Sequence, residues 1–205
     1  MICYGKSDEH QHFPGNLSLK GETLACIIRD IVQSVVNNGF KRIVFFNGHG
    51  GNYATLGGLV REFRLNHRIM AVHCDWDSLY GLNDNIAEIE ELKYGIHAGE
   101  VETSLMLAMR PELVNEELCH KFDNRAARIT EGKNELLRLY GRVSMGWAMH
   151  DLNENGACGD ASKASVKKGE HLIKLVSERF ALLINEVAEF DLNLINECSH
   201  SHCSE

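Results

Sequence analysis

Two short segments of the chain carry residue types that bind metal ions. In the first, residues 45–52 are FFNGHGGN, so His49 follows an apolar run and is flanked by Asn47, Asn52 and three glycines. Neutral imidazole is the commonest side-chain metal ligand, and glycine lets the backbone approach a ligand closely. A plain strand-to-helix turn would explain the histidine alone. The density of glycine and asparagine favours a site with His49 as a ligand.

In the second segment, residues 97–104 are HAGEVETS, where two carboxylates and a histidine surround Gly99 at a predicted helix start. Glu100 is explained by the helix dipole, which favours acidic residues in the first turn. Glu102 leads into the apolar residues 105–107, and a carboxylate at such a boundary needs a partner. We therefore predict Glu102, rather than Glu100, as a metal ligand.

A third polar segment, residues 4–19, is YGKSDEHQHFPGNLSL and ends in a Pro-Gly turn. A solvated loop and a part of the site are equally compatible with this composition. Asp8, His10 or His12 would supply a third metal ligand only if this loop folds across the site.

Apolar periodicity predicts the elements that position these segments. Helices are predicted over 22–38, 53–66, 101–109 and 165–189, and strands over 43–46 and 69–72. This alternation predicts an α/β fold with a mainly parallel sheet. Ligands of such sheets gather at the carboxyl ends of the strands, which places residues 47–52 at the mouth of the site. Because residues 43–46 are all apolar, we expect that strand to be central and buried on both faces.

Composition excludes several classes of function. The 205 residues carry a net charge of −8, which argues against nucleic-acid or anionic-membrane partners. Seven scattered cysteines are typical of reduced thiols in the cytoplasm. Neither a signal peptide nor a run of apolar residues long enough to span a bilayer is expected. One domain is predicted over 1–192, followed by a polar tail over 193–205, whose Cys and His residues (198, 200, 202 and 203) match no zinc module.

Four segments together resemble the creatininase (creatinine amidohydrolase) family. They are YGKSDEHQHFPGNLSL, GFKRIVFFNGHGGN, HAGEVETSLMLAMRPELV and GACGDASKASVKKGEHL. The resemblance implies a three-layer α/β/α fold and a centre of one or two zinc, manganese or iron ions. It also implies hydrolysis of peptide or non-peptide C–N bonds, and a homo-oligomer that is often a hexamer.

The resemblance also suggests roles for single residues. His49 and Glu102 match the metal ligands of the family, and His97 matches a histidine beside the substrate that is a candidate proton donor. Trp76 lies near the position of a substrate-facing aromatic residue, although the match is loose and a core position explains this tryptophan better. Each of these roles is an expectation carried over from the family pattern.

One part of the family pattern is not found in the printed sequence. The family begins with a strand ending in Glu-x-His-Gly-x-His-Leu-Pro and a following Asp, which supply most of the metal ligands. The nearest string, residues 9–14 (EHQHFP), has a different spacing. We therefore expect a chain that lacks the N-terminal metal-ligand segment and, with two ligands where catalytic zinc sites use three, binds metal weakly.

The predicted function is hydrolysis of an amide, cyclic amide or formamide bond of a small molecule by metal-activated water, with zinc the expected metal. Asn47 or Asn52 would orient the substrate carbonyl or the loop itself. The alternative is a catalytically inactive homologue that serves as a binding or oligomer subunit. A serine hydrolase is disfavoured because no G-x-S-x-G occurs, and a dinucleotide-binding enzyme because residues 48–53 break the G-x-G-x-x-G pattern.

Overall fold

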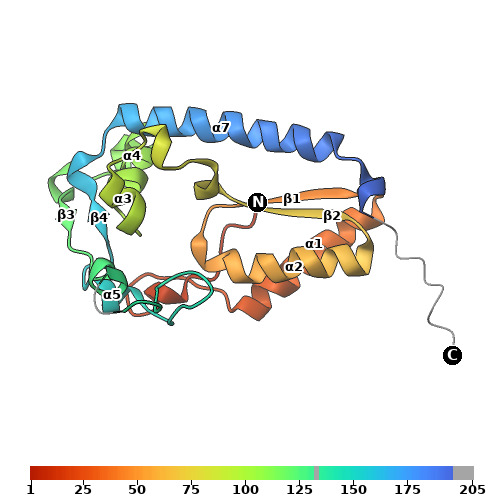
Figure 1. Ribbon diagram of the computed structural model, residues 1–205, viewed down its shortest axis with the longest axis horizontal. Helices are drawn as coiled ribbons and strands as arrows, with labels where there is room; N and C mark the ends of the chain where they lie inside the picture. The colour runs from red at the N-terminus through yellow and green to blue at the C-terminus, as the bar shows by residue number, and fades with distance from the viewer. Residues whose placement is uncertain (132–133, 196–205) are drawn as a thin grey trace.

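The computed structural model describes residues 1–131 and 134–195, and helices predominate in it (Figure 1). The four longer helices are α1 (Gly21–Asn37), α2 (Tyr53–His67), α4 (Glu100–Met109) and α7 (Val166–Glu189). The shorter helices are α3 (Ile89–Tyr94), α5 (Ala126–Glu131) and α6 (Met149–Leu152). The strands are β1 (Arg42–Asn47), β2 (Met70–Asp75), β3 (Lys121–Phe122) and β4 (Gly159–Asp160). Short 3₁₀ turns connect them, of which η1 (Asp8–His10) and η3 (Trp76–Leu79) concern the site.

The helices form where amphipathic periodicity predicts them. In α1 the buried residues Leu24, Ile28 and Val32 recur every four positions, so one stripe faces the core. Gly39 follows α1 with φ +86°, a left-handed conformation that suits glycine and ends the helix. The Ser165 side chain accepts a hydrogen bond from the Lys168 N–H and caps the start of α7.

Strands β1 and β2 form a parallel pair between two layers of helices. Their register runs from Arg42 opposite Met70 to Asn47 opposite Asp75. Figure 1 shows α1 and α2 on one side of this pair and α7 on the other. On the α2 side the Phe45 and Phe63 rings stack with centroids 5.9 Å apart, and on the α7 side the Phe46 and Phe180 rings lie 4.4 Å apart. In Figure 1 the carboxyl ends of both strands point towards the middle of the molecule.

The structure corrects two expectations about the sheet. An α/β fold is present, but in place of one mainly parallel sheet, the described residues form a two-stranded parallel sheet, β1–β2, and a separate two-stranded antiparallel sheet, β3–β4. The prediction that strand 43–46 is central and buried on both faces is wrong. β1 has only β2 as a described neighbour, its residues 43–45 are half-buried, and 47% of Phe46 is exposed. Its apolar residues pack on helices on both faces without being enclosed by further strands.

The long helix α7 runs along one side of the molecule and packs tightly on α4 (Figure 1). The contact requires Gly169, because a Cβ atom there would overlap the Ser104 carbonyl oxygen. Next to it, the fully buried Glu100 carboxylate accepts a charged hydrogen bond from the Lys168 ammonium. Besides the apolar core that includes Leu24 and Phe63, two apolar clusters of described residues are centred on Met149 and on Leu172.

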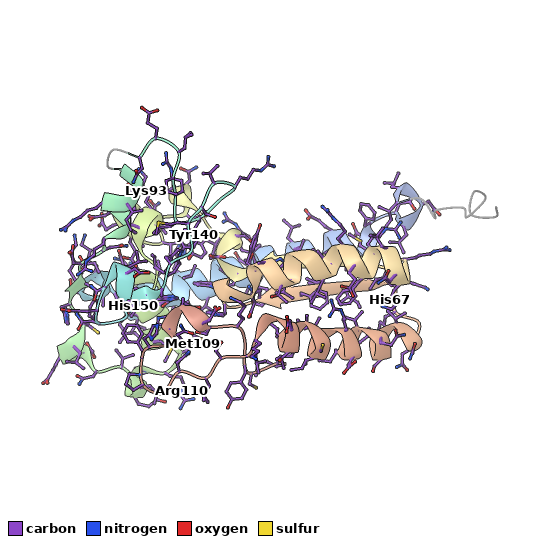
Figure 2. The ribbon with its side chains drawn as sticks, turned by 90° about the horizontal axis from the view of Figure 1, so that it is seen from below. His67, Lys93, Met109, Arg110, Tyr140 and His150 are labelled. Carbon is purple, nitrogen blue, oxygen red and sulfur yellow. The ribbon has the colours of Figure 1, made fainter. Side chains whose placement is uncertain are left out.

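Figure 2 shows the two ends from below, with His67 of α2 at one end and Lys93, Tyr140 and His150 at the other. None of the described helices is both long enough and apolar enough to cross a membrane. The predicted polar tail begins near the short turn Leu192–Leu194, and its Cys and His cluster at 198–203 lies outside the described residues.

Candidate metal centre

The FFNGHGGN segment places His49 at the carboxyl ends of the parallel strands. Asn47, the last residue of β1, is 5% exposed. Its amide nitrogen donates to the Asp75 carboxylate at 2.6 Å and to the His49 carbonyl at 2.8 Å. Asn47 thereby joins the ends of β1 and β2 and fixes the direction of the turn that carries His49.

The N-terminal segment folds across this turn. The Lys6 N–H donates to the Asn52 side-chain oxygen at 2.9 Å, and the Asn52 amide nitrogen donates to the Asn47 side-chain oxygen at 3.1 Å. The His49 Nε2 atom lies 2.8 Å from the Lys6 carbonyl oxygen. Gly51 makes this approach possible, because a Cβ atom there would overlap the Lys6 carbonyl oxygen and lie 2.6 Å from His49 Nε2.

The folded segment brings the turn η1 to the candidate centre, where side chains of types that bind metal ions form a compact group. Ligand atoms of Glu9, His10 and His97 all lie within 4.8 Å of one another. Glu9 Oε1 is 3.2 Å from His10 Nδ1 and 3.5 Å from His49 Nε2. The rings of His10 and His97 lie with their centroids 4.6 Å apart. Three segments far apart in the sequence thus meet at one point.

His97 and Glu102 are held by local backbone structure at the start of α4. His97 pairs with Cys158: the Cys158 N–H donates to the His97 carbonyl at 2.8 Å. Ala98 then turns the chain with φ 52°, a left-handed conformation that costs a non-glycine residue about 1–2 kcal/mol. Its N–H donates to Glu102 Oε2 at 2.8 Å, and Glu102 Oε1 lies 3.8 Å from His97 Nδ1. Such strain is typical of sites whose surroundings fix an unfavourable backbone.

The carboxyl groups of Glu9 and Glu102 both have a pKa below the ordinary value, so both ionise more readily than in water. Desolvation raises the pKa of Glu9, but its own N–H, the Ser7 hydroxyl and His49 outweigh this and hold the pKa below its ordinary value. Desolvation likewise raises the pKa of Glu102, and the neighbouring His97 imidazole and Ala98 N–H reverse the shift. Negative charge therefore persists between the imidazoles, as cation binding requires.

Gly99 leaves room for the buried carboxylate of Glu91, which lies beside the candidate metal centre. A Cβ atom at Gly99 or Gly159 would collide with the Glu91 carboxylate, which accepts a hydrogen bond from the Asp160 N–H at 3.0 Å. Burial raises the pKa of Glu91. The glycine in HAGEVETS is therefore explained by its packing against Glu91 and not by the close approach of a ligand.

The structure separates the residues singled out in the sequence into four groups. The Glu9–His10 pair is surrounded by His49, His97 and Glu102. The side chains of Asn47 and Asn52 form hydrogen bonds with the backbone and side chains that hold the turn in place, the Asp75 carboxylate among them. Trp76 packs against Tyr80, with ring centroids 5.4 Å apart, at the edge of the apolar cluster around Leu172. Two polar residues of the N-terminal loop have other partners: Asp8 pairs with Lys6, and His12 lies against His150.

Glu9 is the residue of the centre that sequence reasoning did not single out. The signal was its position beside His10 in a segment rich in polar groups. Its role depends on contacts more than 40 residues away along the chain, such as the bond between His49 and Lys6.

The donor set fits a divalent transition metal. Catalytic zinc sites use three protein ligands and leave one coordination position open. Two imidazoles with one carboxylate are one of the ligand sets found in such sites. Ligands bonded at about 2.0–2.2 Å lie at most about 4.4 Å apart. The three side chains therefore need only small rotations to share one ion.

The chain belongs to the creatinine amidohydrolase (creatininase) family, whose model matches residues 1–184. It is 29% identical to the mycofactocin precursor peptide peptidase of Mycolicibacterium smegmatis over 191 residues, which are 92% of this chain and 63% of the relative. It is 35% identical to the creatinine amidohydrolase of Pseudomonas putida over 124 residues, which are 54% of this chain and 46% of the relative. It is 24% identical to the 3-dehydro-scyllo-inosose hydrolase of Thermotoga maritima over 92% of this chain and 64% of the relative. The chain thus spans less than two thirds of each of these relatives.

Solved structures share the fold. A crystal structure of creatinine amidohydrolase matches with a TM-score of 0.66 and 25% identity, covering 91% of this chain and 74% of that one. A Bacteroides fragilis protein provisionally described as a creatinine amidohydrolase matches with a TM-score of 0.75, 25% identity and coverage of 92% and 71%. Creatininases with manganese and with two zinc ions are among the structural relatives.

Proposed function

We propose that this chain is a metal-dependent amidohydrolase that cleaves a C–N bond of a small molecule. In this proposal Glu9, His10 and His97 hold a divalent ion, zinc in the first place and manganese or iron as alternatives. The observation that carries it is the convergence of the three ligand atoms within 4.8 Å, in a chain of the creatininase family. Two imidazoles and one carboxylate are donors that zinc accepts readily.

When bound, such an ion supplies a water of lowered pKa and polarises an amide carbonyl. The residues of the chain position its ligands. The Glu102 carboxylate lies beside His97 Nδ1, and a carboxylate beside a ligating histidine fixes the orientation and tautomer of the ring. His49 and the Ser7 hydroxyl, which donates to Glu9 Oε1 at 3.0 Å, fix the Glu9 carboxylate from two sides.

His49 is a positioning residue in this arrangement, in contrast to the role that the family resemblance suggests. Its Nε2 atom faces the Lys6 carbonyl, an acceptor, so Nε2 carries the proton. A protonated ring nitrogen has no lone pair for a metal ion, so Nε2, the ring nitrogen that faces Glu9, does not bind the ion in this arrangement. His49→Ala is therefore expected to weaken metal binding about 10–100-fold, the effect of removing a residue that orients a ligand.

The two possible roles of His97 lead to different results. If His97 is a ligand, as proposed, His97→Ala loses both metal and turnover. If His97 is instead the proton donor expected from the family resemblance, the same variant keeps its metal and loses turnover alone.

The test is metal analysis of the full chain and of the variants Glu9→Gln, His10→Ala and His97→Ala, after equilibration with zinc. The matched control is His12→Ala, a histidine on the same segment whose ring lies against His150. We expect about one ion in the full chain and in the control, and a loss of at least ten-fold in affinity in each of the three variants. An amidase assay on the same samples measures release of the amine from N-acyl compounds.

Full zinc occupancy in both Glu9→Gln and His97→Ala would overturn the assignment of the ligands. Zinc bound at the proposed residues without turnover of any amide would favour the other candidate, an inactive homologue with a binding role.

A further inference from the structure

A hollow borders the candidate metal centre on the side of residues 93–96. It encloses about 360 Å³ and lies between this segment and residues 138–140. Ile96, one of its lining residues, directly precedes His97. A volume in this range accommodates a small organic molecule. We call it the Tyr94–Tyr140 hollow.

The charge of the hollow is opposite to that of the molecule. Lys93 and Arg138 line it, and no carboxylate residue is among its described lining residues. Within the described part of the chain neither cation forms an ion pair. Three carbonyl oxygens, of Asn134, Glu135 and Leu137, accept hydrogen bonds from the Arg138 guanidinium at 2.8–3.0 Å and fix its orientation. In a protein of net charge −8 this is a local positive site.

A neighbouring hollow provides the contrast. It lies on the other side of Tyr94 and Gly95, which line both, and six of its lining residues are carboxylates against two lysines. An anion approaching this end of the molecule is therefore drawn to the Tyr94–Tyr140 hollow and repelled from its neighbour.

Aromatic surface completes the hollow. Tyr140 is 59% exposed, and its ring packs edge-on against Trp147 with centroids 5.5 Å apart. Partial desolvation of its hydroxyl, together with the charges of Cys158 and Glu9, holds the Tyr140 pKa above its ordinary value, so the hydroxyl lies within electrostatic reach of a proposed metal ligand. Figure 2 shows Lys93 and Tyr140 at the same end of the molecule, away from His67.

We propose that the Tyr94–Tyr140 hollow binds the carboxylate end of an amide substrate that carries an aromatic or apolar side group, such as an N-acyl amino acid. Lys93 and Arg138 bind the carboxylate, and the faces of Tyr94 and Tyr140 receive the side group. The scissile amide then lies towards His97 and Glu9. This position of the amide rests on the proposed function, whereas binding of the carboxylate does not.

The experiment compares two probes, N-acetyl-L-phenylalanine and N-acetyl-L-phenylalaninamide, in which a neutral carboxamide replaces the carboxylate of the acid. Binding to the full chain is measured by calorimetry, with zinc and with a chelator, and is located from the amide NMR signals of Gly95 and Ile96. We expect the acid to bind at least ten-fold more tightly than the amide, since a charged hydrogen bond is about twice as strong as a neutral one.

Variants assign the residues. Lys93→Ala is expected to weaken binding of the acid about five-fold and to leave binding of the amide unchanged. Lys121→Ala removes a lysine from the neighbouring hollow and is the matched control, with less than two-fold change. Tyr140→Phe should bind as the unmodified chain does, and Tyr140→Ala about three-fold more weakly. Arg138→Lys keeps the positive charge and removes the guanidinium. It tests whether the guanidinium itself contributes to binding of the acid, and it leaves a long side chain in the loop.

Equal affinities for the two probes would overturn the proposal, as would an equal effect of Lys93→Ala and Lys121→Ala. Preference for the acid in metal-free protein, combined with no turnover, would support the hollow and contradict the proposed function. Metal-dependent turnover without preference for the acid would support the proposed function and contradict the proposal for the hollow.

Discussion

At the scale of single residues, two adjacent glycines test how the centre is built. A Cβ atom at Gly51 would overlap the Lys6 carbonyl oxygen, whereas a Cβ atom at Gly50 meets nothing within 4 Å. Gly51→Ala should displace the N-terminal segment with Glu9 and His10, and weaken zinc binding about 10–100-fold. Gly50→Ala should leave zinc binding unchanged. Zinc titration of both variants measures the difference, and equal affinities would contradict the described contact between Gly51 and Lys6.

The sequence singled out some of the residues that meet at the candidate centre. His49, His97 and Glu102 stood out because glycine-rich surroundings are locally visible in the chain. Glu9 did not, because what makes it part of the site is the fold of residues 5–19 over the turn after β1. That fold depends on hydrogen bonds such as the one from the Lys6 N–H to Asn52, across 46 residues, and no local pattern encodes them.

At the scale of elements, a glycine pair tests the packing of α7. In α7, Gly169 lies against the Ser104 carbonyl of α4, whereas Gly58 in α2 has open space where a Cβ atom would be. Gly169→Ala should lower the free energy of unfolding by about 1–3 kcal/mol, because α4 and α7 must separate. Gly58→Ala should raise it by about 0.5–1 kcal/mol, because alanine favours the helix. Urea unfolding of both variants measures the changes, and stabilisation by Gly169→Ala would show that the two helices are not in contact there.

Helices were predicted better than sheets, for a physical reason. The stripe of Leu24, Ile28 and Val32 records the helical period of α1 within a single segment. Strand order records contacts between segments, and two apolar runs predict two strands without predicting how many others join them. Strands β3 and β4 have two residues each, too few to show a period of two.

At the scale of the whole molecule, an ion pair between distant segments contributes to the response of stability to acid. The Arg179 guanidinium of α7 donates to both Asp84 oxygens at 2.6 and 2.7 Å. These hydrogen bonds hold the pKa of Asp84 below its ordinary value. A depressed folded-state pKa gives stability that is present above the unfolded-state pKa, about 3.9, and that is lost as the pH falls through the folded-state value.

The free energy of unfolding of Asp84→Asn should therefore fall below that of the unmodified chain at pH 7, and the difference should shrink as the pH drops below about 4. Urea unfolding at a series of pH values measures it. Asp30→Asn, on the exposed face of α1, is the control and should change little. A difference between Asp84→Asn and the unmodified chain that stays constant down to pH 2 would rule out this ion pair as its source.

The bond between Asn47 and Asp75 has a consequence for how the candidate metal centre assembles during folding. The two residues are register partners at the ends of β1 and β2, so a slip of one residue would part them and turn the side chains of one strand to the opposite face. The same asparagine anchors the turn of His49 and, through Asn52, the N-terminal segment. A chain with misaligned strands would therefore fold without assembling the ligands. If the chain binds zinc as proposed, zinc uptake during refolding counts only the molecules whose strands are correctly aligned, and it then measures correct folding as well as binding.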